Sequence, residues 1–222
     1  MFNFKNGFLQ WHILISIVVM SFVSGCSHLS AHSQSSTPTQ TVNSAFGFDI
    51  TVPEEWLALT ADIIRLNKIS AEKLNDSRVD KKTLEKVLPA ILGGQSEMYF
   101  MLNDFSQEAN NFVNVISSIG LIPEKDVLEG LCEATEEQLT LAFEKTTKLD
   151  SCEYRKLGKV TSIYIEFDGL EEGTKNAQYH AYDVDNDIKD LYIVFSITAQ
   201  KSHFTDISNA LQDSLKTVNW HK

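Results

Sequence analysis

VTSIYIEFDGLEEGTKNAQYHAYDVDNDIKDLYIVFSITA, residues 160–199, is the stretch of this 222-residue chain that decides its fold. In its first segment, 160–167, the apolar residues Ile163, Ile165 and Phe167 alternate with polar or aromatic residues. This is the period-two pattern of a half-buried strand. Two more strand-like segments follow at 178–184 and 191–199. Short turn signals join the three segments, so we expect them to pair as an antiparallel meander.

Further strands are expected before this meander. The residues that precede Pro53 alternate in the same way, which predicts a strand at 46–52. Shorter strand-like runs occur at 97–102 and 112–117, and a further run at 154–157 is expected to be the first strand of the meander itself. The sheet should therefore have more strands than the meander alone supplies.

Segments with helical spacing of apolar residues lie between and after these strands. The spacing predicts a short helix from Leu57 to Leu66, a second from Leu84 to Ile91, and a long one from Leu128 to Phe143. A closing amphipathic helix should begin at Ser202. Because such helices bury their apolar faces on a sheet, we expect an α+β fold, an antiparallel β-sheet flanked by helices as an α/β/α sandwich.

Two short motifs and the order of the last elements point to a known fold. The first strand runs into Val-Pro-Glu-Glu-Trp at 52–56, and Asn-Phe-Val-Asn-Val at 111–115 precedes the long helix. With the terminal hairpin and the closing helix, they resemble the Mog1/PsbP-like fold over about residues 46–218. The resemblance implies a binding or accessory module of a larger assembly rather than an enzyme.

The N-terminus has the pattern of a bacterial lipoprotein signal. The apolar run from Ile13 to Val23 is eleven residues long, which suits a secretory signal and is too short to span a bilayer. Val23-Ser24-Gly25-Cys26 follows and resembles the bacterial lipobox. We therefore expect a signal peptide at 1–25, cleavage before Cys26 and lipidation of Cys26. The alternative is an uncleaved anchor helix from Gly7 to Gly25.

The negative charge of the chain indicates that an attached lipid, rather than electrostatic attraction, would hold it at a membrane. Loss of Lys5 with the signal leaves 18 basic against 30 acidic side chains, a net charge of −12. Anionic lipid and nucleic acid both repel such a surface, so we expect no nucleic-acid partner. Two or three acyl chains, which the lipoprotein resemblance implies, hold a protein firmly at a membrane.

Residues 26–45 read as an acylated cysteine followed by a flexible tether. Ser27–Ala45 contains six Ser and three Thr and no charged residue, a composition that cannot bury a core. The rest, 46–222, is expected to form a single α+β domain. Ser27 follows the modified cysteine. In a Gram-negative host a serine at this position favours transport of the lipoprotein to the outer membrane, where it would face the periplasm.

The two remaining cysteines, Cys132 and Cys152, would lie in an oxidising compartment of the cell envelope. They could form a disulfide, provided that the chain after the long helix doubles back along it. They could equally be buried free thiols that pack as small hydrophobes.

No pattern of catalytic or metal-ligating residues is found, and we expect no metal and no cofactor. The acidic run at 183–190 lacks the turn glycine and the bidentate glutamate of a calcium loop. His180 lies in a strand and is expected to be structural rather than catalytic. Trp56 and Trp220 could form a recognition patch or cover the core, and the core role is expected.

Two functions of different classes fit these features. The first is a lipid-anchored binding or accessory module that engages another envelope protein. The second is a small-ligand or lipid carrier, or an envelope enzyme, with a pocket between the sheet and the long helix. The absence of catalytic spacing favours the first, and an enzyme is the less favoured class.

Overall fold

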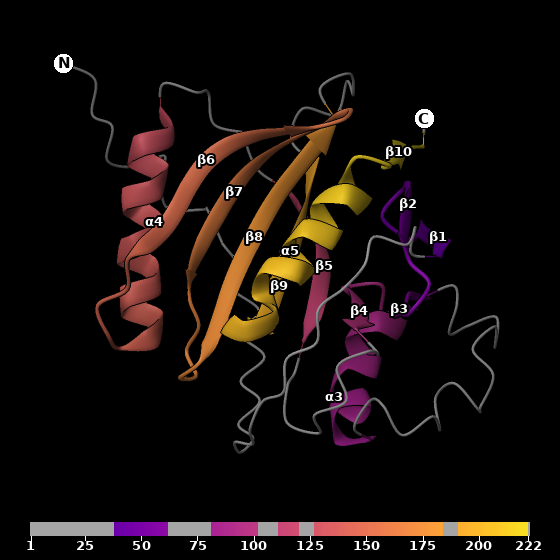
Figure 1. Ribbon diagram of the computed structural model, residues 1–222, viewed down its shortest axis with the longest axis horizontal. Helices are drawn as coiled ribbons and strands as arrows, with labels where there is room; N and C mark the ends of the chain where they lie inside the picture. The colour runs from indigo at the N-terminus through magenta and orange to yellow at the C-terminus, as the bar shows by residue number, and fades with distance from the viewer. Residues whose placement is uncertain (1–37, 62–80, 102–110, 120–126, 184–190, 222) are drawn as a thin grey trace.

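A seven-stranded antiparallel sheet forms the centre of the protein (Figure 1). The computed structural model describes residues 38–61, 81–101, 111–119, 127–183 and 191–221. Across the sheet the strand order is β3-β4-β5-β9-β8-β7-β6, and every neighbouring pair is antiparallel. The strands are β3 Trp56–Leu59, β4 Glu97–Met101, β5 Phe112–Ile119, β9 Leu191–Gln200, β8 Thr174–Asp183, β7 Val160–Asp168 and β6 Leu149–Leu157. The expected meander is confirmed as β6 to β9.

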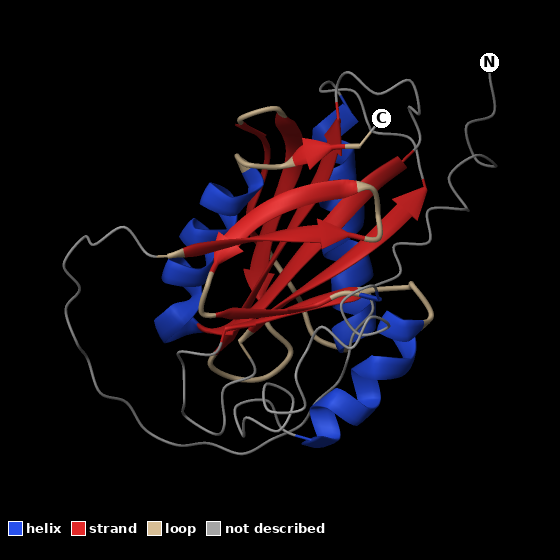
Figure 2. Cartoon of the chain, turned by 90° about the vertical axis from the view of Figure 1, so that its right-hand side faces the viewer, coloured by secondary structure: helices blue, strands red, loops and turns tan. Residues whose placement is uncertain are grey.

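Helices cover both faces of this sheet (Figure 2). One face carries helix α5, Lys201–Leu215, and a small three-stranded sheet made of β1 Thr39–Ser44, β2 Phe48–Pro53 and β10 Asn219–Trp220. The opposite face carries α3, Lys81–Leu92, and α4, Leu128–Phe143. The expected α+β architecture, an antiparallel sheet between helices, is confirmed.

The alternation of side chains along the strands separates the two cores. On β7, Val160 and Tyr164 contribute to the core under α5, whereas Ile163, Ile165 and Phe167 pack against α4. The core under α5 is the larger one and joins the small sheet to the central sheet through fully buried residues, among them Phe48, Ile50, Tyr99 and Phe195. Each strand therefore serves two cores with successive residues.

The helix expected from Leu57 to Leu66 is wrong over its first residues, which form strand β3. Trp56 and Ala58 enter the core under α5, while Leu57 and Leu59 enter the core under α3. A strand that is buried on both faces is apolar throughout, so its period of two is hidden in the sequence. The remainder of that expected helix, from 62 onward, lies outside the described residues.

The expected end of the tether is also corrected. Residues 39–44 form strand β1, which pairs antiparallel with β2, and the side chains of Val42 and Ser44 are buried. A polar Ser/Thr-rich segment can be ordered by backbone pairing although it contributes only two buried side chains to the core. The folded domain therefore includes residues 39–44, which precede Phe46, and residues 26–37 lie outside the described residues.

Candidate functional site

A cluster of charged and aromatic side chains lies on the face of β6, β7 and β8, beside α5. Helix α5 crosses β8 and β9, and among the described residues no other helix lies on this face over β6 and β7 (Figure 1). We call the group of charged and aromatic side chains the Arg155 cluster, and its members are Glu153, Arg155, Tyr164, Glu166, Lys175 and Tyr179. Tyr164 and Tyr179 are buried members of the core under α5, and the charged side chains lie at its partly exposed border.

Strand register brings these side chains together. Because Ile163, Ile165 and Phe167 point toward α4, the residues between them on β7 must point to the α5 face. Tyr164 lies opposite Glu153 of β6 and opposite Tyr179 of β8 in the antiparallel pairing. Cross-strand neighbours of this kind lie close enough for direct contact.

Arg155 is the centre of the cluster. Its guanidinium carbon lies 3.4 Å from the centroid of the Tyr164 ring, a cation–π stack. Its Nε and Nη2 lie 2.8 Å and 2.7 Å from Oε1 of Glu153. Its Nη1 donates to the Tyr179 hydroxyl at 3.5 Å. The side chain is thus oriented from three directions.

Two further contacts tie the cluster to its surroundings. The Tyr179 hydroxyl lies 3.2 Å from Oγ of Ser208 on α5, and the Tyr164 hydroxyl donates to the carboxylate of Glu166. Lys175 bridges that carboxylate, at 2.5 Å, to Asp150, at 3.3 Å.

The charges of this network are paired within the protein. Arg155 and Lys175 face three carboxylates, those of Glu153, Glu166 and Asp150. The hydrogen bond to Glu166 raises the pKa of Lys175, and although burial lowers the pKa of Arg155, the hydrogen bond to Glu153 and the nearby tyrosines raise it overall. Both cations therefore keep their charge at neutral pH, and no cation of the cluster lacks a counter-ion.

Burial raises the pKa of the two tyrosines, so their hydroxyls stay protonated at neutral pH. A protonated hydroxyl that is already hydrogen-bonded is a poor base and a poor nucleophile. The rings of Tyr164 and Tyr179 are buried, so only the charged groups of the cluster can contact another molecule. These groups reach solvent, since half of the Glu153 side chain and a quarter of the Arg155 side chain are exposed.

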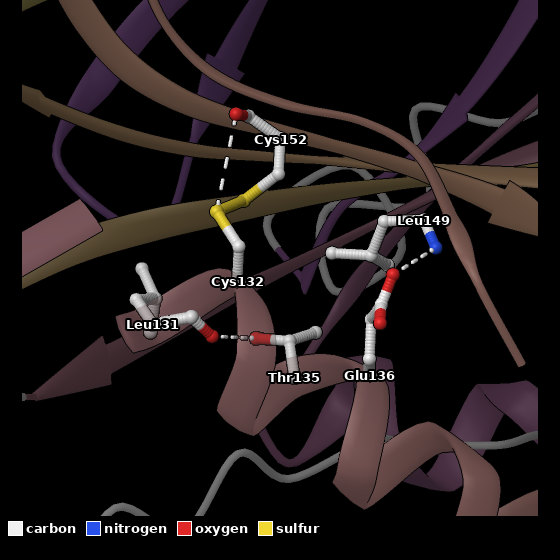
Figure 3. The surroundings of a disulfide bond; sticks show 6 residues. All are labelled: Leu131, Cys132, Thr135, Glu136, Leu149 and Cys152. Atoms are coloured by element: carbon white, nitrogen blue, oxygen red, sulfur yellow. Dashed lines mark hydrogen bonds between the residues drawn. A yellow bond between two sulfur atoms is a disulfide. The ribbon is translucent and has the colours of Figure 1, made fainter. Parts of the chain in front are cut away.

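The structure brings together the two cysteines that the sequence left open. Cys132 of α4 and Cys152 of β6 form a disulfide with their Cα atoms 6.0 Å apart (Figure 3). Next to it, Oε1 of Glu136 accepts a hydrogen bond of 2.9 Å from the Leu149 backbone N–H, and Lys148 pairs with the same carboxylate. The chain after α4 does double back along the helix, as a bridge requires.

His180 lies on the other face of the sheet from the Arg155 cluster. Its ring stacks on Tyr192 with 5.6 Å between centroids, and its Nε2 lies 3.0 Å from Oε1 of Gln178. Burial lowers the pKa of His180 to about 4, so the imidazole is neutral at physiological pH.

The two tryptophans named in the sequence analysis belong to the core. Trp56 is buried in the cluster under α5. Trp220 packs edge-on against Phe48 with 5.6 Å between ring centroids. They do not form a shared exposed patch.

Cys26 and the acidic residues from 184 to 190 lie outside the described residues. Within the described ranges, no three His, Cys, Asp or Glu side chains are arranged to hold a metal ion. No helix of that same part of the chain is both long and apolar enough to cross a membrane.

Sequence reasoning missed the Arg155 cluster as a site. The available signal was the polar and aromatic set that alternates with the apolar residues of β6 and β7: Glu153, Arg155, Tyr164 and Glu166. That set shows which side chains share a face, but only the register shows that they touch.

Comparison with known proteins finds similarity at the level of the fold. No protein-family model and no curated protein sequence matches the chain. Its structure is similar to that of cyanobacterial PsbP (CyanoP) from Synechocystis sp. PCC 6803, with a TM-score of 0.48 and 9% identity over 90% of this chain and 99% of that one. It is also similar to the Ran-binding protein Mog1p of Saccharomyces cerevisiae, with a TM-score of 0.45 and 11% identity over 83% and 96% of the two chains. PsbP and Mog1 are the proteins after which the fold that the sequence motifs resemble is named.

Proposed function

We propose that this protein is a bacterial lipoprotein, held at a membrane of the cell envelope through lipid on Cys26, whose domain binds another envelope protein. The observation that carries the proposal is the disulfide between Cys132 and Cys152. Disulfides of this kind persist in oxidising compartments such as the periplasm, so the bridge favours export. The chain has three cysteines, and the bridge leaves only Cys26, which stands in the lipobox.

The Arg155 cluster supports a binding role for the domain. Its cations are oriented by neighbouring side chains and are partly exposed, which suits recognition of a protein surface, while the buried tyrosines hold them in place. The alternative, a carrier or enzyme with a pocket between the sheet and α4, has less support. Leu139 and Phe143 of α4 pack directly against Ile163, Ile165 and Phe167, so side chains fill the described part of that interface.

The anchor is tested with the full chain expressed in a bacterial host. Cys26→Ala should abolish incorporation of labelled fatty acid, whereas the double variant Cys132→Ser, Cys152→Ser should retain it. Intact mass of the wild type should show a mature chain that begins at the modified Cys26. A wild-type chain that keeps residues 1–25 and carries no lipid would overturn the anchor and favour the uncleaved helix.

The binding role is tested by crosslinking in the native envelope, followed by identification of the captured proteins. A specific partner should be recovered with the wild type and lost with Arg155→Ala. Lys156→Ala, which changes the exposed neighbour on the same strand, is the matched control and should keep the partner. Equal recovery with both variants would remove the Arg155 cluster from the interface.

In a Gram-negative host, fractionation should place the protein in the outer membrane, as Ser27 suggests.

A further inference from the structure

Among the described residues the two sheets end in four edge strands, and three of them carry features that block pairing with another chain. Strand β6 is charged and has an irregular register between Leu149 and Ser151, while β3 has four residues and β10 has two. Short strands, charges and bulges all protect a sheet edge. Strand β1 is different: its sequence TQTVNS is six residues long, uncharged, and free of Pro, Gly and bulges.

The pairing of β1 with β2 shows which backbone groups face outward. The Pro38 carbonyl accepts a hydrogen bond from the Glu54 N–H at 2.9 Å. Hydrogen-bonded pairs alternate with non-hydrogen-bonded pairs along an antiparallel ladder. The register therefore directs the backbone N–H and C=O groups of Gln40, Val42 and Ser44 toward β2 as well.

The intervening residues, Thr39, Thr41 and Asn43, must then direct their N–H and C=O groups to the free edge. Their side chains are exposed, whereas those of Val42 and Ser44 are buried. Within the part of the chain that the structure describes, no strand pairs with this edge. It is a template for one more strand.

We propose that β1 pairs with β1 of a second copy of this chain, antiparallel and about a two-fold axis through Thr41. In that register Thr41 faces Thr41 of the second copy, and Thr39 faces Asn43. These facing pairs, Thr41 with Thr41 and Thr39 with Asn43, are uncharged and able to hydrogen-bond, which stabilises cross-strand contact. The two small sheets would join into one continuous six-stranded sheet.

Charge favours this edge as the contact between copies. The mature chain carries a net charge of −12, so two copies repel each other over most of their surface. β1 contributes no charge of its own. A self-pairing surface must avoid facing like charges, and β1 meets that condition whereas β6 does not.

Anchoring at Cys26 would raise the local concentration of β1 edges, which pairing between two copies requires. A six-residue strand is much smaller than the roughly 20 to 30 residues a side of a stable interface, so pairing in dilute solution should be weak. Cys26 lies twelve residues before Pro38, so anchored copies would hold this edge close to one membrane surface. Confinement of that kind raises the effective concentration. This step rests on the proposed lipid anchor.

The experiment uses single cysteine substitutions in the full chain, with mild oxidation of intact cells and non-reducing electrophoresis. Thr41→Cys should give a covalent dimer, because facing residues on antiparallel strands are close enough for a disulfide. Thr39→Cys should not, because its counterpart lies about four residues away along the strand. Thr146→Cys, an exposed threonine between α4 and β6, is the matched control and should stay monomeric.

A second variant tests the pairing without a new thiol. Thr41→Lys places like charges face to face and should abolish a dimer detected by amine crosslinking of wild-type membranes, while Thr146→Lys should leave it unchanged. A Thr41→Cys chain that dimerises no more than Thr146→Cys overturns the proposal, and this is also the result if residues 27–37 or a different protein occupy the edge.

The lipid on Cys26 is measured in the same samples by mass, which separates the two proposals. Lipidated chains without the Thr41 crosslink refute the pairing and leave the anchor intact. If the lipid is absent, the same oxidation of the purified chain at millimolar concentration decides the pairing alone.

Discussion

The guanidinium of Arg155 stacks on the ring of Tyr164, with 3.4 Å between its central carbon and the ring centroid. The two residues lie on neighbouring strands, and the same guanidinium contacts Glu153 and Tyr179. A planar cation is needed to make these contacts at once, because an ammonium group neither stacks flat on a ring nor presents a fork of donors.

Replacement of Arg155 by lysine should therefore show how much the planar contact contributes to the free energy of unfolding. Arg155→Lys should lower the free energy of unfolding by about 1 kcal/mol, the size of a partly desolvated cation–π pair. Urea unfolding monitored by tryptophan fluorescence measures it, with Lys156→Ala as a control that should change stability by less than about 0.5 kcal/mol. Full retention of stability in Arg155→Lys would mean that charge alone matters at this position.

Two glycines should respond in opposite directions to the same substitution. Gly158 lies in the β6–β7 turn with φ +63°, and a Cβ atom there would meet the Lys216 carbonyl oxygen at 2.7 Å. Gly158→Ala should therefore cost about 2 kcal/mol or more. Gly130 lies on the exposed side of α4, and its added Cβ would meet nothing within 4 Å.

Gly130→Ala should in consequence stabilise the protein by up to about 1 kcal/mol, because alanine is the better helix former. Thermal unfolding of the two variants side by side measures both effects. A Gly158→Ala protein as stable as the wild type would show that the close approach of this turn to the end of α5 is not required.

Most of the central sheet could be predicted, because its strands carry local signals. The alternation of Ile163, Ile165 and Phe167 indicates a strand with one apolar face, which packs on α4 in the structure. The apolar spacing of 128–143 predicts the helix that covers this face. Strand β3 could not be read in the same way, since both of its faces are buried.

Features that depend on long-range pairing could not be predicted. Strand β1 has few apolar residues and is ordered by its ladder with β2, so its composition resembles a linker. The contact between Arg155 and Tyr179 joins residues 24 positions apart through the register of three strands. Sequence period alone shows which face each residue occupies and does not show its neighbours.

The bridge between Cys132 and Cys152 should stabilise the domain by about 3 kcal/mol. It closes a loop over a sequence separation of 20, and a loop of that length restricts the unfolded chain by this amount in the chain-entropy account. The double variant Cys132→Ser, Cys152→Ser should unfold at correspondingly lower urea.

Reductant provides the control for this prediction. Dithiothreitol should lower the stability of the wild type to that of the double variant and should leave the double variant unchanged. A wild type that is insensitive to reductant after thiol labelling shows complete reduction would contradict the prediction.

Stability should fall as the pH is lowered from about 6.5 to about 4, because partial burial keeps His180 in its neutral form. Its pKa in the folded protein, about 4, lies below the ordinary value of 6.5, so in this window the unfolded chain binds a proton that the folded chain does not. Above pH 6.5 both states are neutral at His180 and its effect vanishes.

Carboxylates act mainly at lower pH and can be separated from His180. Favourable contacts lower the pKa of Glu136 and of Asp168, so the stability that they contribute is lost only below their ordinary values of 4.5 and 3.8. His180→Gln should therefore flatten the dependence of unfolding free energy on pH between about 5 and 6.5. His203→Gln, on the exposed side of α5, should keep the slope of the wild type. Equal slopes in all three proteins over that window would show that His180 is protonated in the folded state, and the neutral stack on Tyr192 would then be wrong.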